Sequence, residues 1–317
     1  MGLVALTVSA CAQSETKAPE ELIQPSSETE LSFANFERTD SSSFEDILAD
    51  YQALNERLAR VTAPLRVANA TLCPETWRDP GFSTHKLSDY PTRLQPFAQA
   101  LLGLSPDGLH IRSVRAGTAA ERARVEAGDQ ILTVNGQDIS SDPSMNRYNE
   151  AVLKNGFSIL RPRMIVRTNQ GREFTAKIEP ETACRAPTRV VFSDTINGHT
   201  DGQEILITSA LMRNVPDDTN LALVVAHEMA HLIAGHVEQE PSQALELEAD
   251  RMALVLMARA GYDIDGAIAY WENASHPHDG GQINESSHPT TKARYENFKA
   301  ELKRIRKTRD ISELRFN

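Results

Sequence analysis

Apolar residues recur every three or four positions from residue 44 onward, which predicts an amphipathic helix. The apolar positions are Phe44, Ile47, Leu48, Tyr51, Leu54, Leu58 and Val61. Ser42 and Glu45 fit a capping box at the start of this helix, and Pro64 is expected to break it. We therefore expect a helical segment within residues 42–72 that packs one face against another part of the chain.

Short stretches of alternating apolar and polar residues follow between residues 97 and 180, and they predict β-strands. The predicted strands are Leu109–Val114, Gln130–Val134 and a hairpin of Met164–Thr168 with Glu173–Ile178. Residues 75–95 contain too many turn formers for an assignment. This part of the chain is thus expected to be a small β-rich unit.

Residues 186–317 form a third unit, in which two short strands precede long helices. The strands are predicted at Arg189–Phe192 and Glu204–Thr208. An apolar helix is expected from about Asp218 to Glu238, and a second helix from about Ser242 to Arg259. The three units together predict a protein of the α+β class.

The first of these helices carries the sequence His227-Glu228-Met229-Ala230-His231. Histidines four positions apart lie on one helical face, so both imidazoles can reach one Zn²⁺, and Glu228 projects beside the metal. That position suits a general base that acts on zinc-bound water, which then attacks a carbonyl. The flanking residues are almost all apolar, so the helix is expected to be buried, and buried histidines and glutamate need partners such as a metal. Hydrogen-bonded core histidines are the alternative.

The next helix offers a third metal ligand. Glu246 and Asp250 lie one turn apart on a face that is otherwise apolar. Two like charges in that arrangement are unfavourable unless a cation compensates them. We assign Glu246 to the metal and Asp250 to the orientation of one histidine. Glu248 points elsewhere and is expected to be solvated, with Arg251 as a candidate partner.

The HExxH motif, the Glu-x-x-Ala-Asp run at 246–250 and a strand that ends in Ile-Thr resemble the gluzincin metallopeptidases of the HtpX and CAAX prenyl protease type, which include soluble periplasmic members. The resemblance implies a mainly α-helical zinc metallopeptidase domain with one Zn²⁺ and a small edge β-sheet. Substrate peptide would lie along an edge strand at 204–211. His288 would stabilise the oxyanion or donate a proton. A histidine that blocks the open zinc position and a plain loop histidine are the alternatives.

A second resemblance lies in the β-rich unit. Residues 117–120 (GTAA) and 128–136 (GDQILTVNG) are similar to the signature of PDZ domains. The resemblance implies a small β-barrel over residues 97–180, in which Leu102, Gly103 and Leu104 belong to the loop that binds a peptide carboxylate. A C-terminal peptide would add as a strand beside the following strand. A scaffold that only packs within the molecule is the alternative.

The N-terminus resembles a bacterial lipobox, because Val8-Ser9-Ala10 precedes Cys11. Residues 1–11 would then be a lipoprotein signal, Cys11 the lipidated residue and residues 12–41 a polar tether. The resemblance implies an anchor to the outer membrane in the bacterial periplasm. Cys73 and Cys184 would remain as an even pair in an oxidising compartment, and we expect a disulfide between them. Two unrelated buried thiols are the alternative.

Composition excludes two classes of function. The 317 residues carry a net charge of −11, which argues against nucleic acid as the main partner. No apolar run approaches the ~18–20 residues that a membrane-spanning helix needs.

We therefore expect a zinc endopeptidase that cleaves misfolded or misassembled envelope proteins. One alternative is a PDZ-bearing chaperone or adaptor lipoprotein with a latent or structural zinc site. The other is a hydrolase of cell-wall peptides.

Overall fold

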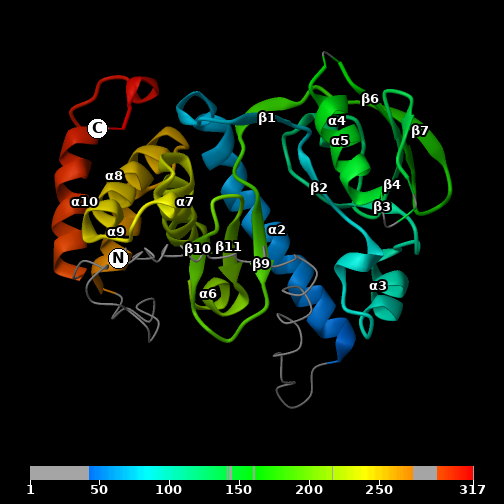
Figure 1. Ribbon diagram of the computed structural model, residues 1–317, viewed down its shortest axis with the longest axis horizontal. Coiled ribbons are helices and arrows are strands. Elements are labelled where there is room, and N and C mark those ends of the chain that lie inside the picture. The colour runs from blue at the N-terminus through cyan, green and yellow to red at the C-terminus, as the bar shows by residue number, and fades with distance from the viewer. Residues whose placement is uncertain are drawn as a thin grey trace, which may run out of the picture.

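The computed structural model describes residues 43–140, 142, 145–159, 161–215, 217–273 and 291–316. Cys11, the tether and His288 lie outside these residues, so the predictions made for them stay predictions. Within them, a long helix runs between a group of C-terminal helices and a β-sheet, as Figure 1 shows. No helix in the described ranges has the length and apolar character to cross a membrane.

The long helix is α2 (Phe44–Ala68), and it differs from the prediction at two points. Its N-cap is Ser43 rather than Ser42: the Ser43 hydroxyl accepts a hydrogen bond from the Asp46 N–H, and the Asp46 carboxylate accepts one from the Ser43 N–H. Pro64 lies inside the helix and does not end it. A proline costs a helix about 3 kcal/mol, and burial of neighbours such as Leu65 offsets that cost.

Two separate hydrophobic cores organise the chain. The first joins α2 to the C-terminal helices and contains Leu58, Leu65, Met229 and Ala253. The second lies inside the β-rich unit, where its members run from Phe82 to Ile178. The helix predicted within residues 42–72 therefore packs mainly as part of the C-terminal unit.

The β-rich unit is built on a six-stranded antiparallel sheet. In spatial order the strands are β2 (Phe82–His85), β3 (Leu109–Val114), β4 (Gln130–Val134), β6 (Arg163–Arg167) and β7 (Glu173–Lys177), with β5 (Gln137–Asp138) paired to β4. Helices α4 (Ala119–Arg122) and α5 (Asn146–Phe157) belong to the same unit. Strands β2 and β7 end the order of the described strands, so these strands form an open sheet rather than the small barrel that we expected, while the predicted α+β class is confirmed.

The strands predicted by alternation are present with the expected bounds or within one residue of them. β2 was missed because Pro80 and Gly81 precede it and only four residues follow in extended form. Helix α3 (Gln95–Leu102) and two 3-10 turns, η1 (Ala70–Leu72) and η2 (Leu87–Asp89), were also missed.

Two strands connect the sheet to the rest of the molecule. β1 (Thr76–Asp79) pairs with β8 (Glu181–Cys184), and the disulfide Cys73–Cys184 closes this connection with a Cα–Cα distance of 5.5 Å. The predicted disulfide is thus confirmed. It joins residues 111 positions apart, and the whole sheet lies in the loop that it closes.

The C-terminal unit contains a three-stranded sheet in the order β10-β11-β9. Its strands are β9 (Thr188–Val191), β10 (Gly198–Thr200) and β11 (Ile205–Thr208). β11 is paired on both sides, so residues 204–211 do not form the edge strand that we expected. The edge beside the helices is β10, which was not predicted because it has only three residues and begins with glycine.

Five α-helices of the described chain complete this unit. They are α6 (Ser209–Asn214), α7 (Asp218–Ala234), α8 (Gln243–Arg259), α9 (Ile264–Asn273) and α10 (Thr291–Ile305), with 3-10 turns η4 (His236–Glu238) and η5 (Ile311–Glu313). α7 ends four residues earlier than predicted, because Gly235 adopts φ 64° and terminates it as a left-handed cap. α7 and α8 pack against each other and carry the candidate site.

Candidate metal centre

His227 and His231 present their Nε2 atoms to the same point beside α7. The two Nε2 atoms are 3.1 Å apart, and the Glu246 carboxylate of α8 lies 3.4 Å from the first and 3.5 Å from the second. The ligand atoms of the three side chains all lie within 4.8 Å of one another. The structure therefore brings together the three residues that the sequence assigns to the metal.

This donor set fits zinc. Catalytic zinc sites commonly have three protein ligands drawn from imidazole nitrogens and a carboxylate oxygen, and they leave a fourth position open. Two imidazoles from one helix and a carboxylate from the next provide this set. The three side chains are partly buried, at 13%, 14% and 16% exposure, so water competes only weakly for them.

Asp250 contacts Nδ1 of His227, the ring nitrogen that does not face the other donor atoms. Its Oδ1 lies 3.0 Å from Nδ1 of His227, and Arg294 of α10 donates hydrogen bonds of 2.9 and 2.6 Å to the two carboxylate oxygens. Asp250 is almost completely buried, and a buried carboxylate requires such a cationic partner. The orientation that we expected of Asp250 is thus present, while its pairing with Arg294 was not predicted.

The charges of this cluster shift the pKa values of its members. Burial raises the pKa of Asp250, but Arg294 outweighs burial and lowers it to about 2. Burial lowers the pKa of His227, but hydrogen bonds to Asp250 and Glu246 raise it to about 9. Burial likewise raises the pKa of Glu246, and His227 outweighs this effect and lowers it to about 2. Without a metal, His227 therefore holds a proton between two carboxylates, in the place where a cation would bind.

Glu228 lies at the edge of this cluster, beside β10. Burial raises its pKa to about 7, with a further increase from Glu246, whereas a hydrogen bond from the Thr200 backbone acts in the opposite direction. This value belongs to the cluster without a metal ion, and a cation bound beside Glu228 would lower the pKa. The contact with Thr200 also brings β10, an edge of the three-stranded sheet among the described strands, next to this carboxylate.

Sequence reasoning missed the partner of His231. The ring of His236, in η4, lies with its Nδ1 3.1 Å from Nδ1 of His231, and His236 is 5% exposed. Glu248 is 41% exposed, as expected of a solvated residue, and its carboxylate lies 3.8 Å from Nε2 of His236. Arg251, its candidate partner, bonds Asn297 instead. The sequence signal that could have identified this partner was His236 itself, a third histidine five residues after His231.

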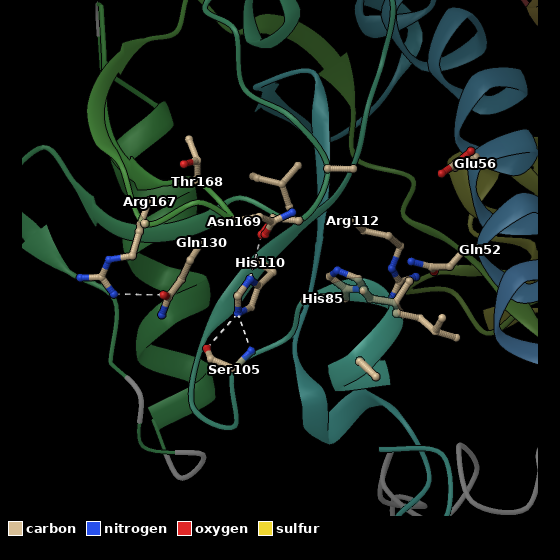
Figure 2. Close-up of a pocket in the computed structure, with 18 residues that line it drawn as sticks. Gln52, Glu56, His85, Ser105, His110, Arg112, Gln130, Arg167, Thr168 and Asn169 are labelled. Atoms are coloured by element: carbon tan, nitrogen blue, oxygen red, sulfur yellow. Dashed lines mark hydrogen bonds between the residues drawn. The ribbon is translucent and has the colours of Figure 1, made fainter. Parts of the chain in front are cut away.

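A separate pocket of about 570 Å³ lies between α2, α3 and the larger sheet (Figure 2). Leu102 and Gly103 of the predicted carboxylate loop line it, whereas Leu104 is buried in the first core. The following strand, β3, is paired with β2 and with β4, so a peptide cannot extend along it as we expected. Among the described strands, the edge strand that contributes to this pocket is β2, through His85.

The polar side chains of this pocket bond mainly to the protein itself. His110 bonds Ser105 and the Gly128 carbonyl, as Figure 2 shows for Ser105. Arg112 donates to Asn55 of α2. The bond from Arg112 connects α2 and the larger sheet across the pocket wall.

Comparisons with known proteins agree with both resemblances. A family model described as PDZ domain matches residues 92–147, and a model described as Peptidase family M48 matches residues 193–245 and 239–302. No curated protein matches the chain.

Seven chains of solved structures match as well. One is the crystal structure of the HtrA3 PDZ domain bound to a phage-derived ligand (FGRWV), which is 21% identical and covers 34% of this chain and 89% of that chain. Its TM-score is 0.26. The two family matches and the geometry around the HExxH motif lead to one conclusion: the chain carries a PDZ domain and a metallopeptidase domain of peptidase family M48.

Proposed function

We propose that this protein is a zinc-dependent endopeptidase in which His227, His231 and Glu246 hold one Zn²⁺ and Glu228 is the general base. The observation that carries the proposal is the convergence of the three donor side chains, with the half-buried carboxylate of Glu228 beside them. When bound, zinc would activate a water molecule and polarise the scissile carbonyl. Glu228 accepts the proton of the attacking water and returns it to the leaving amine.

The substrate of this proposal is an extended polypeptide that pairs with β10. That strand is an edge of the three-stranded sheet, and the contact between Thr200 and Glu228 puts it beside the base. A peptide added to an edge strand gains main-chain hydrogen bonds that do not depend on its side chains. Such binding suits unfolded segments of many sequences, which supports misfolded or misassembled envelope proteins as substrates.

The location proposed is the bacterial periplasm, with the protein anchored to the outer membrane through lipid on Cys11. The disulfide between Cys73 and Cys184 supports an oxidising compartment, because structural disulfides are rare in the cytosol. Mass spectrometry of the protein from membranes would detect the lipid on Cys11, and a protein without it would contradict the anchor.

Glu228→Gln tests the mechanism. The substitution keeps the size of the side chain and removes its ability to accept a proton, so we expect zinc content to stay and cleavage of unfolded casein to fall by at least a hundredfold. Glu240→Gln, an exposed residue of the loop after α7, is the matched control and should cleave normally. Full activity of Glu228→Gln would remove Glu228 as the base.

The same assay separates the alternatives. A chaperone or adaptor with a structural zinc site would bind unfolded casein without cleaving it, with or without a chelator. A cell-wall hydrolase would leave casein intact and release peptides from peptidoglycan. Either result would contradict the proposed endopeptidase.

A further inference from the structure

The two histidines of the HExxH motif have different partners at their Nδ1 atoms. Nδ1 of His227 faces the carboxylate of Asp250, whereas Nδ1 of His231 faces another imidazole, that of His236, at 3.1 Å. Gly235 makes this contact possible, because its left-handed conformation ends α7 and turns the chain so that His236 lies beside the last turn of the helix. The rings of His231 and His236 meet nearly edge to face, with centroids 5.0 Å apart.

We propose that His236 is a positioning residue of the metal centre, and that Glu248 acts through it to fix the proton on Nδ1 of His231. The inference rests on the proposed zinc site and adds two residues to it. It concerns the orientation and tautomer of a ligand, so His236 itself would touch neither metal nor substrate.

The contact between the two Nδ1 atoms allows a proton on one of them at a time. A neutral histidine that binds a metal through Nε2 must carry its proton on Nδ1. His231 is therefore the donor in this pair and His236 the acceptor. The reverse arrangement would put the proton of neutral His231 on Nε2, where it would block the metal.

Glu248 favours the productive arrangement. As an acceptor at Nδ1, neutral His236 carries its own proton on Nε2, and that atom lies 3.8 Å from the partly exposed Glu248 carboxylate, within the range of an ion-pair attraction. A carboxylate at this distance stabilises a proton on Nε2 and disfavours one on Nδ1. Three carboxylates of α8 thus contact three different groups. Glu246 lies near Nε2 of both His227 and His231. Asp250 contacts Nδ1 of His227, and Glu248 lies near Nε2 of His236.

Two substitutions of nearly the same shape test the inference. His236→Asn keeps an oxygen acceptor close to the position of Nδ1, and His236→Leu has similar size but no acceptor. Supporting groups behind zinc ligands are typically worth about ten- to a hundredfold in metal affinity. We expect zinc affinity, measured by competition with a chromophoric chelator, to fall by that factor in His236→Leu and by less than about threefold in His236→Asn. The loss of zinc affinity in Glu248→Gln should lie between the losses in these two variants.

The outcomes distinguish this inference from the proposed function. If the wild-type protein binds no zinc, the proposed function fails. If the wild-type protein binds zinc and His236→Leu binds it equally well, only the positioning role fails. Thermal unfolding of the zinc-free variants reports whether they fold.

Nitrogen-15 NMR of the zinc-loaded wild-type protein is a second measurement that needs no variant. It should show His231 protonated at Nδ1 and His236 protonated at Nε2. A proton on Nδ1 of His236 would overturn the inference.

Discussion

The carboxylate of Asp250 is held between Nδ1 of His227 and the guanidinium of Arg294, at 3.0 Å from the first and 2.6 Å from the second. Three helices contribute to this contact: α7, α8 and α10. It therefore links the orientation of a predicted zinc ligand to the packing of the C-terminal helix.

Asp250→Asn should lower both the free energy of unfolding and the affinity for zinc. The amide keeps an acceptor for His227 but removes the negative charge that Arg294 contacts in a largely buried position, and breaking a buried ion pair typically costs about 3–5 kcal/mol. We expect the free energy of unfolding of the zinc-free protein, measured in urea, to fall by about that amount, and zinc affinity to fall about tenfold. The double variant Asp250→Asn/Arg294→Gln should recover part of the stability. Arg294→Gln alone completes the cycle, and a loss in the double variant equal to the sum of the losses in the two single variants would show that the two residues are not coupled.

Replacement of Glu246 should remove the metal rather than the fold. Glu246→Gln cannot supply an anionic oxygen, so we expect less than a tenth of the zinc of the wild-type protein after dialysis, as measured by elemental analysis. Glu240→Gln is the control, since that side chain is exposed and lies before α8. An unchanged zinc content in Glu246→Gln would exclude Glu246 from the ligand set.

Regular patterns in the sequence predicted the parts of this fold that depend on local periodicity. β3 and β4 alternate and have the predicted bounds, and the one-turn spacing of Glu246 and Asp250 correctly put both on the face of α8 that meets α7. A side chain that must lie on a known face of a regular element can thus be located from spacing alone.

The features that were missed depend on contacts between distant segments. β10 is a strand because it pairs with β11, and Pro64 is tolerated because tertiary packing holds α2 together. Arg294 acquires its role only because α10 packs against α8 beside the HExxH helix. Neither spacing nor composition contains that information.

Stability should fall as pH decreases below about 6.5, because His85 resists protonation in the folded protein. Burial, followed by the charge of Arg112, lowers its pKa from 6.5 to about 3. Between these two values the unfolded chain binds more protons than the folded one, so protons favour unfolding. One shifted group changes the free energy of unfolding by at most about 1.4 kcal/mol per pH unit, or about 2 kcal/mol between pH 6.5 and pH 5.

Urea unfolding at pH 7 and pH 5 measures this effect. In His85→Asn, which accepts a hydrogen bond but does not titrate, the loss of stability between the two pH values should be smaller by about 2 kcal/mol. His199→Asn is the control, since His199 is exposed. If His85→Asn loses as much stability as the wild-type protein, His85 is not the source of the pH dependence.

The disulfide should stabilise the connection between the two units more than either unit itself. Neither cysteine belongs to the core of the larger sheet, whose members run from Phe82 to Ile178. Closure of a loop with a sequence separation of 111 contributes up to about 4–5 kcal/mol in the chain-entropy model. In Cys73→Ala/Cys184→Ala we therefore expect a lower free energy of unfolding, and the strands β1 and β8 should open first because they flank the missing bond.

Hydrogen exchange of this double variant locates the effect. Amide exchange should accelerate most in β1 and β8, while β3 and β4 stay close to the wild-type rates because their sheet keeps its own core. Reduction of the wild-type protein should give the same pattern, which controls for effects of the alanines. A uniform acceleration over β3 and β4 would mean that the larger sheet depends on the disulfide for its own fold, and that the connection is not a separate unit of stability.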